Sequence, residues 1–150
     1  TGIYQLTEMR RAAAQLHAAG HAYRLVYLQE PGRFRAPRDS FEAASMASAS
    51  VREQLFAAHY QRRILLTHMR PEVARGHLWP LLPDGLNSEV LGYRNRGGTL
   101  DEAGMLFANS STWAHILLAS ARLLNIPLDN LLSAAQIAAV QGVGDPRDLR

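Results

Sequence analysis

The stretch that decides the fold is Ile64-Leu65-Leu66-Thr67, which is followed by His68-Met69-Arg70 and then by Pro71. A short run that is apolar at nearly every position is typical of a strand covered on both faces, because a strand with one wet face alternates instead. Pro71 suits the first turn of a helix, where its missing N–H is not needed. A buried strand that leads into a helix is the unit of a parallel α/β sheet.

Two more segments are predicted as strands on either side of this unit. Tyr23-Arg24-Leu25-Val26-Tyr27-Leu28 is rich in aromatic and β-branched residues and stops at Pro31-Gly32. Glu89 to Tyr93 is the third strand, and it ends in the polar run Arg94-Asn95-Arg96-Gly97-Gly98. Strands that alternate with helices through short connections predict an α/β fold, as a three-layer α/β/α sandwich with a mostly parallel (mixed) sheet.

Helices are predicted from apolar spacing of three and four residues and from capping residues. Ser50-Val51-Arg52-Glu53 and Thr99-Leu100-Asp101-Glu102 have the spacing of capping boxes, and Asp129 is the predicted cap of the last helix. The helices are expected over residues 3–19, 50–60 and 112–124, from Pro71, just after Glu102, and over 130–141.

Composition places the chain as one domain over residues 1–150, with 47% apolar residues, no cysteine and a formal net charge of +3. All 16 basic residues are arginine, so mechanisms that need a lysine or a thiol are excluded. Neither a membrane span nor a signal-peptide pattern occurs, and we expect a cytoplasmic protein that binds no membrane. Because the chain does not begin with Met, we also expect it to be a fragment of a longer one.

Polar side chains follow the predicted strands, at the edge where ligands collect in open α/β sheets. His68 and Arg70 follow one strand, and Arg94 and Arg96 follow another, with Gly98 ahead of a helix. Arginine forks and glycine amides are what a phosphate or carboxylate needs, so these five residues are the predicted anion site. The alternative is that the strand-end arginines form structural ion pairs with Asp39, Asp101 and Glu102, or meet a partner surface.

Other chemistries are not supported by the sequence. Gly97-Gly98 lacks the spacing of a dinucleotide fingerprint, no nucleophile elbow surrounds Ser110-Ser111, and we predict no catalytic residue. His17 and His21 are four residues apart, but Gly20 between them ends the helix, so no metal site is predicted. The arginines lack interleaved aromatic residues, which makes nucleic-acid binding the weakest of the binding hypotheses.

The order of motifs resembles a known family. The run from Leu91-Gly92-Tyr93 through Gly98-Thr99 to Phe107-Ala108-Asn109, followed by the helix with Trp113-Ala114-His115-Ile116, looks like the closing strand, glycine turn and helix of phosphoketolase C-terminal domains. The wider pattern is similar to the C-terminal domain of the transketolase superfamily, in which a strand ends in Thr-Gly, as at Thr1-Gly2, and enters an amphipathic helix.

The resemblance implies a domain of an enzyme that depends on thiamine diphosphate and Mg²⁺ and acts on ketose phosphates such as xylulose 5-phosphate. In that family the cofactor lies between the first two domains, across a homodimer interface, and the third domain supplies few or no catalytic groups. We therefore expect no cofactor in this domain, partners in the remaining domains and a second copy, and a structural, dimer-supporting or regulatory role. The reaction could be that of a phosphoketolase, a transketolase, a 2-oxoacid dehydrogenase component or a related enzyme. The competing hypothesis is a stand-alone α/β module that binds an anionic phosphometabolite through the strand-end arginines.

Overall fold

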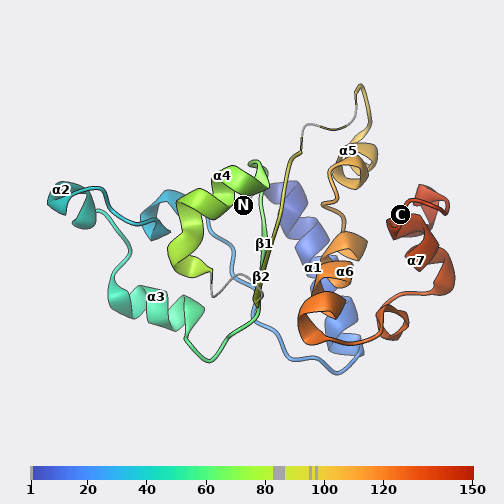
Figure 1. The fold of residues 1–150 in the computed structure, drawn as a ribbon, viewed down its shortest axis with the longest axis horizontal. Helices are drawn as coiled ribbons and strands as arrows, with labels where there is room; N and C mark the ends of the chain where they lie inside the picture. The colour runs from blue at the N-terminus through green and yellow to red at the C-terminus, as the bar shows by residue number, and fades with distance from the viewer. Residues whose placement is uncertain (1, 83–86, 95, 97) are drawn as a thin grey trace.

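The computed structural model describes residues 2–82, 87–94, 96 and 98–150 (Figure 1). Of the residues named above, Thr1, Asn95 and Gly97 lie outside this part of the chain. The helices and strands are α1 (Ile3–Ala18), α2 (Ser40–Ala43), α3 (Ala49–Phe56), β1 (Arg63–Leu66), α4 (Pro71–Leu78), β2 (Ser88–Leu91), α5 (Glu102–Ala108), α6 (Trp113–Leu124) and α7 (Ala134–Val140). Within the described ranges, short 3-10 helices lie between or after them at Pro31–Phe34, Trp79–Leu81, Leu128–Asn130 and Pro146–Leu149.

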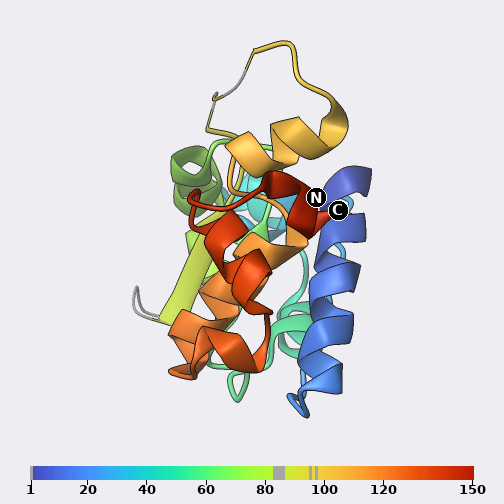
Figure 2. The same ribbon diagram turned by 90° about the vertical axis from the view of Figure 1, so that its right-hand side faces the viewer.

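The two strands form a parallel pair in which Arg63 lies opposite Ser88 and Leu66 lies opposite Leu91. In Figure 1, α4 lies on one side of the strands and α1 and α6 lie on the other, and α4 packs against β2 while α6 contacts both strands. Figure 2 shows α1 running along the molecule, with α7 on the outer side of α6. The described part of the chain is therefore α/β with a two-stranded parallel sheet.

The predicted strand at residues 23–28 is wrong. This segment is irregular, and among the described residues no backbone hydrogen bond joins it to β1. The side chain of Arg24 instead donates to the carbonyl of Gln54 at the end of α3, and its guanidinium lies 4.8 Å from the centre of the Tyr60 ring. Aromatic and β-branched residues favour a pleated, half-buried surface rather than a particular backbone, so their presence alone does not provide a strand partner.

The predicted helices occur, but the residues that begin α3 and α5 differ from the prediction. Ser48, not Ser50, caps α3 by accepting a hydrogen bond from the backbone of Val51 at 3.3 Å. Asp101, not Thr99, caps α5 by accepting from Gly104 at 2.7 Å. Several short polar residues compete at each of these starts, and the one with extended backbone and a free side-chain oxygen becomes the cap.

The last helix is also shorter than predicted. Asp129 lies in a 3-10 helix, and α7 is capped by Ser133, which forms a reciprocal capping box with Gln136. The predicted strands at 64–67 and 89–93 are confirmed with bounds shifted by one or two residues, as β1 and β2.

The main apolar core joins α1, the strands, α6 and α7, with Ile116 and Leu117 almost fully buried at its centre. A bidentate ion pair between Arg122 of α6 and Glu89 of β2, both distances 2.9 Å, ties the helix to the sheet. A second, smaller cluster lies on the other side of the sheet and contains Leu28, Phe34, Leu78 and Leu81. The strands, whose carboxyl ends carry the predicted site, are therefore part of the main apolar core.

Candidate functional site

The carboxyl ends of β1 and β2 hold two polar loops against one another. Beyond the last paired residues, the backbone N–H of Thr67 donates to Leu91 at 2.9 Å and that of Tyr93 donates to Met69 at 3.0 Å. Gly92 lies between them, and a Cβ there would come within 2.9 Å of Thr67 Cγ2 and closer still to the Met69 carbonyl. Only glycine allows the two loops to approach this closely.

Asn109 fixes the loop that carries the predicted anion-binding arginines. Its side chain is almost fully buried, with 3% of the residue exposed. Oδ1 accepts from the backbone N–H groups of Arg94 at 2.8 Å and Arg96 at 3.3 Å, while Nδ2 donates to the carbonyls of Arg96 at 3.1 Å and Met105 at 2.8 Å. One amide thus uses both ends to attach this loop to α5.

The structure brings the predicted site residues together only in part. Arg94 and Arg96 are held in one loop by Asn109. His68 lies near the start of α1, since a Cβ at Gly2 would be 3.8 Å from His68 Nδ1. Arg70 is the exposed residue just before α4. Gly98 lies three residues ahead of Asp101, so its amide is not one of the first-turn amides of α5 that the prediction assumed.

Two of the three acidic partners proposed for these arginines are engaged elsewhere. Asp101 pairs with Arg150 at 3.2 Å, and Asp39 caps α2 by accepting from Glu42 at 2.8 Å. The side chains of Arg70, Arg94 and Arg96 are exposed and make no hydrogen bond or ion pair to another described residue. These arginines therefore present their guanidinium groups to solvent at the strand ends.

The arginines of the loop around residues 33–38 belong to a different structure. Arg35 and Arg38 both bind the carboxylate of Glu42, the first at 2.5 Å. These hydrogen bonds hold the pKa of Glu42 well below its usual range. In Figure 1 this region, next to α2, lies far from the loop that leads into α5. The group around Glu42 is structural, and it takes no part in the strand-end site.

A cavity of about 360 Å³ lies beside the strand-end loop. Its polar groups are two side-chain amides, a carboxylate, two phenol hydroxyls and a serine hydroxyl, which together can donate and accept hydrogen bonds to a hydroxylated ligand. It adjoins the loop of Arg94 through the neighbouring Tyr93 and through Asn109. The residues that line it are Tyr4, Gln5, Tyr93, Leu100, Glu102, Met105, Leu106, Asn109 and Ser111.

His115 is the buried histidine near this loop, with 8% of the residue exposed. Its Nδ1 lies 2.7 Å from Thr112 Oγ1, and its ring meets Phe107 edge-on at 5.6 Å. Burial, together with the positive charges of Arg94 and Arg122, lowers the pKa of His115 to about 4. The imidazole is therefore neutral near pH 7 and serves as a packed hydrogen-bonding group at the start of α6.

The sequence did not single out Asn109 or the Thr112–His115 pair. The spacing of Asn109 behind a glycine turn was visible, but the reach of its amide across fifteen residues to Arg94 depends on the tertiary fold. Over the ranges that the structure describes, no three His, Asp or Glu side chains gather as metal ligands. Within the same ranges, every helix is too short or too polar to cross a bilayer.

No family model, curated protein or solved structure matches this chain. The strand-end geometry and the resemblance of residues 91–116 are therefore what indicate a function for this chain.

Proposed function

We propose that this chain is the C-terminal domain of a thiamine-diphosphate-dependent, transketolase- or phosphoketolase-like enzyme that acts on ketose phosphates such as xylulose 5-phosphate. The supporting observation is that described residues of the run 91–116, which carries the resemblance, are linked by buried hydrogen bonds and a close backbone approach. Gly92 allows the strand loops to meet, Asn109 joins the loop to α5, and Thr112 and His115 fix the start of α6. Gly92, Asn109, Thr112 and His115 of the run thus each make a contact that shapes this part of the chain.

The proposal includes the finer architecture, a three-layer α/β/α sandwich with a mostly parallel sheet. The parallel pairing of β1 and β2 supports it, as does the position of α4 opposite α1 and α6. It also includes a cytoplasmic homodimer in which the remaining domains hold thiamine diphosphate and Mg²⁺. Large apolar side chains exposed on α1 and around the end of α4, Ile3 at 64% and Trp79 at 61%, are suited to such contacts.

Intact mass and sedimentation of the protein purified from its source test this proposal. It predicts a polypeptide several-fold heavier than 16.6 kDa that sediments as a homodimer. A monomeric polypeptide of 16.6 kDa would contradict it and leave the second candidate.

The second candidate is a stand-alone module that binds a small phosphorylated ligand at the strand ends. It is favoured by the exposed guanidinium groups of Arg94 and Arg96 beside the 360 Å³ cavity. Replacing both arginines with alanine should weaken binding of a sugar phosphate at least about ten-fold, because a hydrogen bond to a charged group contributes roughly 1.5–3 kcal/mol.

The control for this titration is Arg75→Ala, an exposed arginine on α4 that should leave affinity unchanged. Equal affinity of the double variant and the unchanged protein would remove the arginines from the site. Binding of RNA that weakens steeply with salt would favour the nucleic-acid hypothesis instead.

A further inference from the structure

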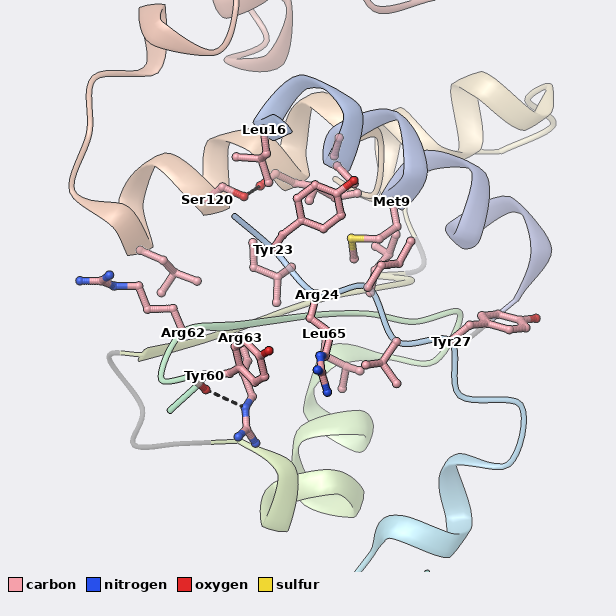
Figure 3. Close-up of a pocket in the computed structure, with 18 of the residues that line it drawn as sticks. Met9, Leu16, Tyr23, Arg24, Tyr27, Tyr60, Arg62, Arg63, Leu65 and Ser120 are labelled. Carbon is pink, nitrogen blue, oxygen red and sulfur yellow. Dashed lines mark hydrogen bonds between the residues drawn. The ribbon is translucent and has the colours of Figure 1, made fainter. Parts of the chain in front are cut away.

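A second cavity, of about 300 Å³, lies away from the strand ends, between α1, the segment 22–28, β1 and α6 (Figure 3). In Figure 3 the segment passes between α1 and β1, and the side chains of Met9 of α1 and Tyr23 of the segment lie next to one another. The walls are mainly aliphatic and aromatic. The apolar lining residues include Leu6, Met9, Ala12, Ala13, Leu16, Leu25, Val26, Leu28, Ile64, Leu65, Leu66, Ile116, Leu123 and Leu124.

The charged residues of the lining are Arg24, Arg62 and Arg63, and none of the described lining residues is acidic. Arg63 is fully engaged, since it donates to the carbonyls of Leu81 at 2.5 Å, Phe56 at 2.8 Å and Tyr60 at 3.2 Å. Arg24 is bound to the Gln54 carbonyl and stacked on Tyr60. The guanidinium groups of Arg24 and Arg63 are therefore already bound within the protein.

Arg62 differs from both. It is exposed and makes no hydrogen bond or ion pair to another described residue. Figure 3 shows its side chain at the outer edge of the cavity, with the guanidinium directed away from the other labelled side chains. The cavity thus combines an apolar interior with one available cation at its mouth.

The segment 22–28 keeps this space open. It forms one wall of the cavity as an irregular segment and not as the strand that its side chains predicted. Water in the apolar part of this space finds few polar partners, because most of the lining is aliphatic or aromatic and Ser120 Oγ already donates to the Ile116 carbonyl at 2.8 Å. An apolar chain would gain dispersion contacts with walls that otherwise face weakly bound water.

We propose that this cavity binds a medium-chain fatty acid, with the alkyl chain among the α1, β1 and α6 side chains and the carboxylate at Arg62. The positive charge of Arg62 favours an anionic group at the mouth of the cavity, and the apolar lining favours an apolar chain in its interior. The volume, at the small end of the range for ligand pockets, selects a chain of medium length. The site is separate from the strand-end arginines and does not depend on the proposed enzyme.

Calorimetric titration of the full chain with decanoate tests the assignment, with decanol as the uncharged probe. We expect one decanoate per chain and weaker binding of decanol. Arg62→Ala should weaken decanoate about ten-fold, in line with loss of one charge-assisted hydrogen bond, and leave decanol unchanged. Ala13→Leu, which fills the cavity from α1, should weaken both ligands, and Arg75→Ala on α4 should affect neither.

Several outcomes would overturn the proposal. Absence of decanoate binding to the unchanged protein would do so, as would equal affinities of the Arg62→Ala variant and the unchanged protein. Ala13→Leu is checked by its unfolding transition, and a folded variant that binds decanoate normally would place the ligand elsewhere. Amide exchange at residues 23–28 as slow as in β1 would also overturn it, because a paired strand there would close the cavity.

Discussion

The half of the molecule built from α1, α6 and α7 and the half built from residues 22–60 are held together by different forces. In the first half the core contains Trp113 and Leu117, with 5% and 0% exposed, and runs without interruption from α1 to the C-terminal 3-10 helix. One of its polar contacts is buried as well. The carboxylate of Glu8 in α1 accepts from the backbone of Trp113 at 2.6 Å, which caps α6 from a distant part of the chain.

In the second half the buried apolar cluster has only four members, two of which, Leu28 and Phe34, belong to residues 22–60. Arginines supply most of the links between its irregular segments. Arg52 donates to the carbonyl of Phe34 at 3.0 Å, and Arg35 and Arg38 converge on Glu42. The contrast shows that burial stabilises the half that carries the strand-end loop, whereas charged hydrogen bonds hold the other half. The two halves should therefore respond differently to mutation and to acid.

The largest expected effect is from Leu117→Ala in the main core. It should lower the free energy of unfolding by about 3–4 kcal/mol, since a fully buried leucine leaves a cavity that the surrounding helices cannot collapse into. Leu28→Ala in the smaller cluster should lower the free energy of unfolding by less, because fewer buried side chains surround the substituted residue in that cluster. Urea unfolding followed by tryptophan fluorescence measures both, and equal losses would remove the difference between the halves.

As the pH falls, the half built from α1, α6 and α7 should lose stability before the half built from residues 22–60. The pKa of His115 is lowered to about 4 in the folded protein and is near 6.5 in the unfolded chain, so the unfolded state binds more protons between these values. The stability associated with neutral His115 is complete above pH 6.5 and is lost as the pH falls from 6.5 to 4, by up to about 3 kcal/mol. The free energy of unfolding at pH 7 and pH 4.5 measures it.

The variant His115→Gln should flatten this pH dependence, and the exposed His77→Gln should not. The same steep dependence in both variants would mean that another group is responsible.

A smaller loss is expected for Glu8→Gln. The amide oxygen of the glutamine still accepts from the backbone of Trp113, but the negative charge at the N-terminus of α6 is lost. This loss should lower the free energy of unfolding by about 1 kcal/mol. Chemical denaturation measures the change, with Glu53→Gln on exposed α3 as the control. A loss as large as that of Leu117→Ala would mean that the charge has a further structural role.

The smallest effect on global stability is expected for Glu42→Gln, with a clear local one. Arg35 and Arg38 lose their shared carboxylate, so amides at residues 31–47 should exchange faster while those of α6 do not change. Because the pKa of Glu42 is held low, the unchanged protein should show the same local loosening only as the pH falls below the ordinary carboxyl range. Faster exchange in α6 would show that the two halves unfold together.

The sequence was sufficient to predict the helices and strands in which the apolar pattern of the side chains matches the backbone structure that forms. The apolar run at 64–67 and the helical spacing over 3–19 and 112–124 each identified an element that the structure contains. It was not sufficient where a residue depends on a distant partner. Residues 23–28 have strand-like side chains but are irregular in the structure, and Ser133 rather than Asp129 caps α7.

The candidate site divides in the same way. The arginines at the strand ends were found because polar residues after parallel strands meet at one edge. Asn109, which fixes their loop, was not found, because its four hydrogen bonds form only after α5 has folded against that loop.

The most direct test of the proposed enzyme is the consumption of xylulose 5-phosphate by the full protein that contains this chain, with and without thiamine diphosphate and Mg²⁺. We predict turnover that requires thiamine diphosphate and is lost in Asn109→Leu, whose strand-end loop is no longer attached, but is kept in the exposed Asn130→Ala. Absence of thiamine-diphosphate-dependent turnover with xylulose 5-phosphate and other ketose phosphates would contradict the account.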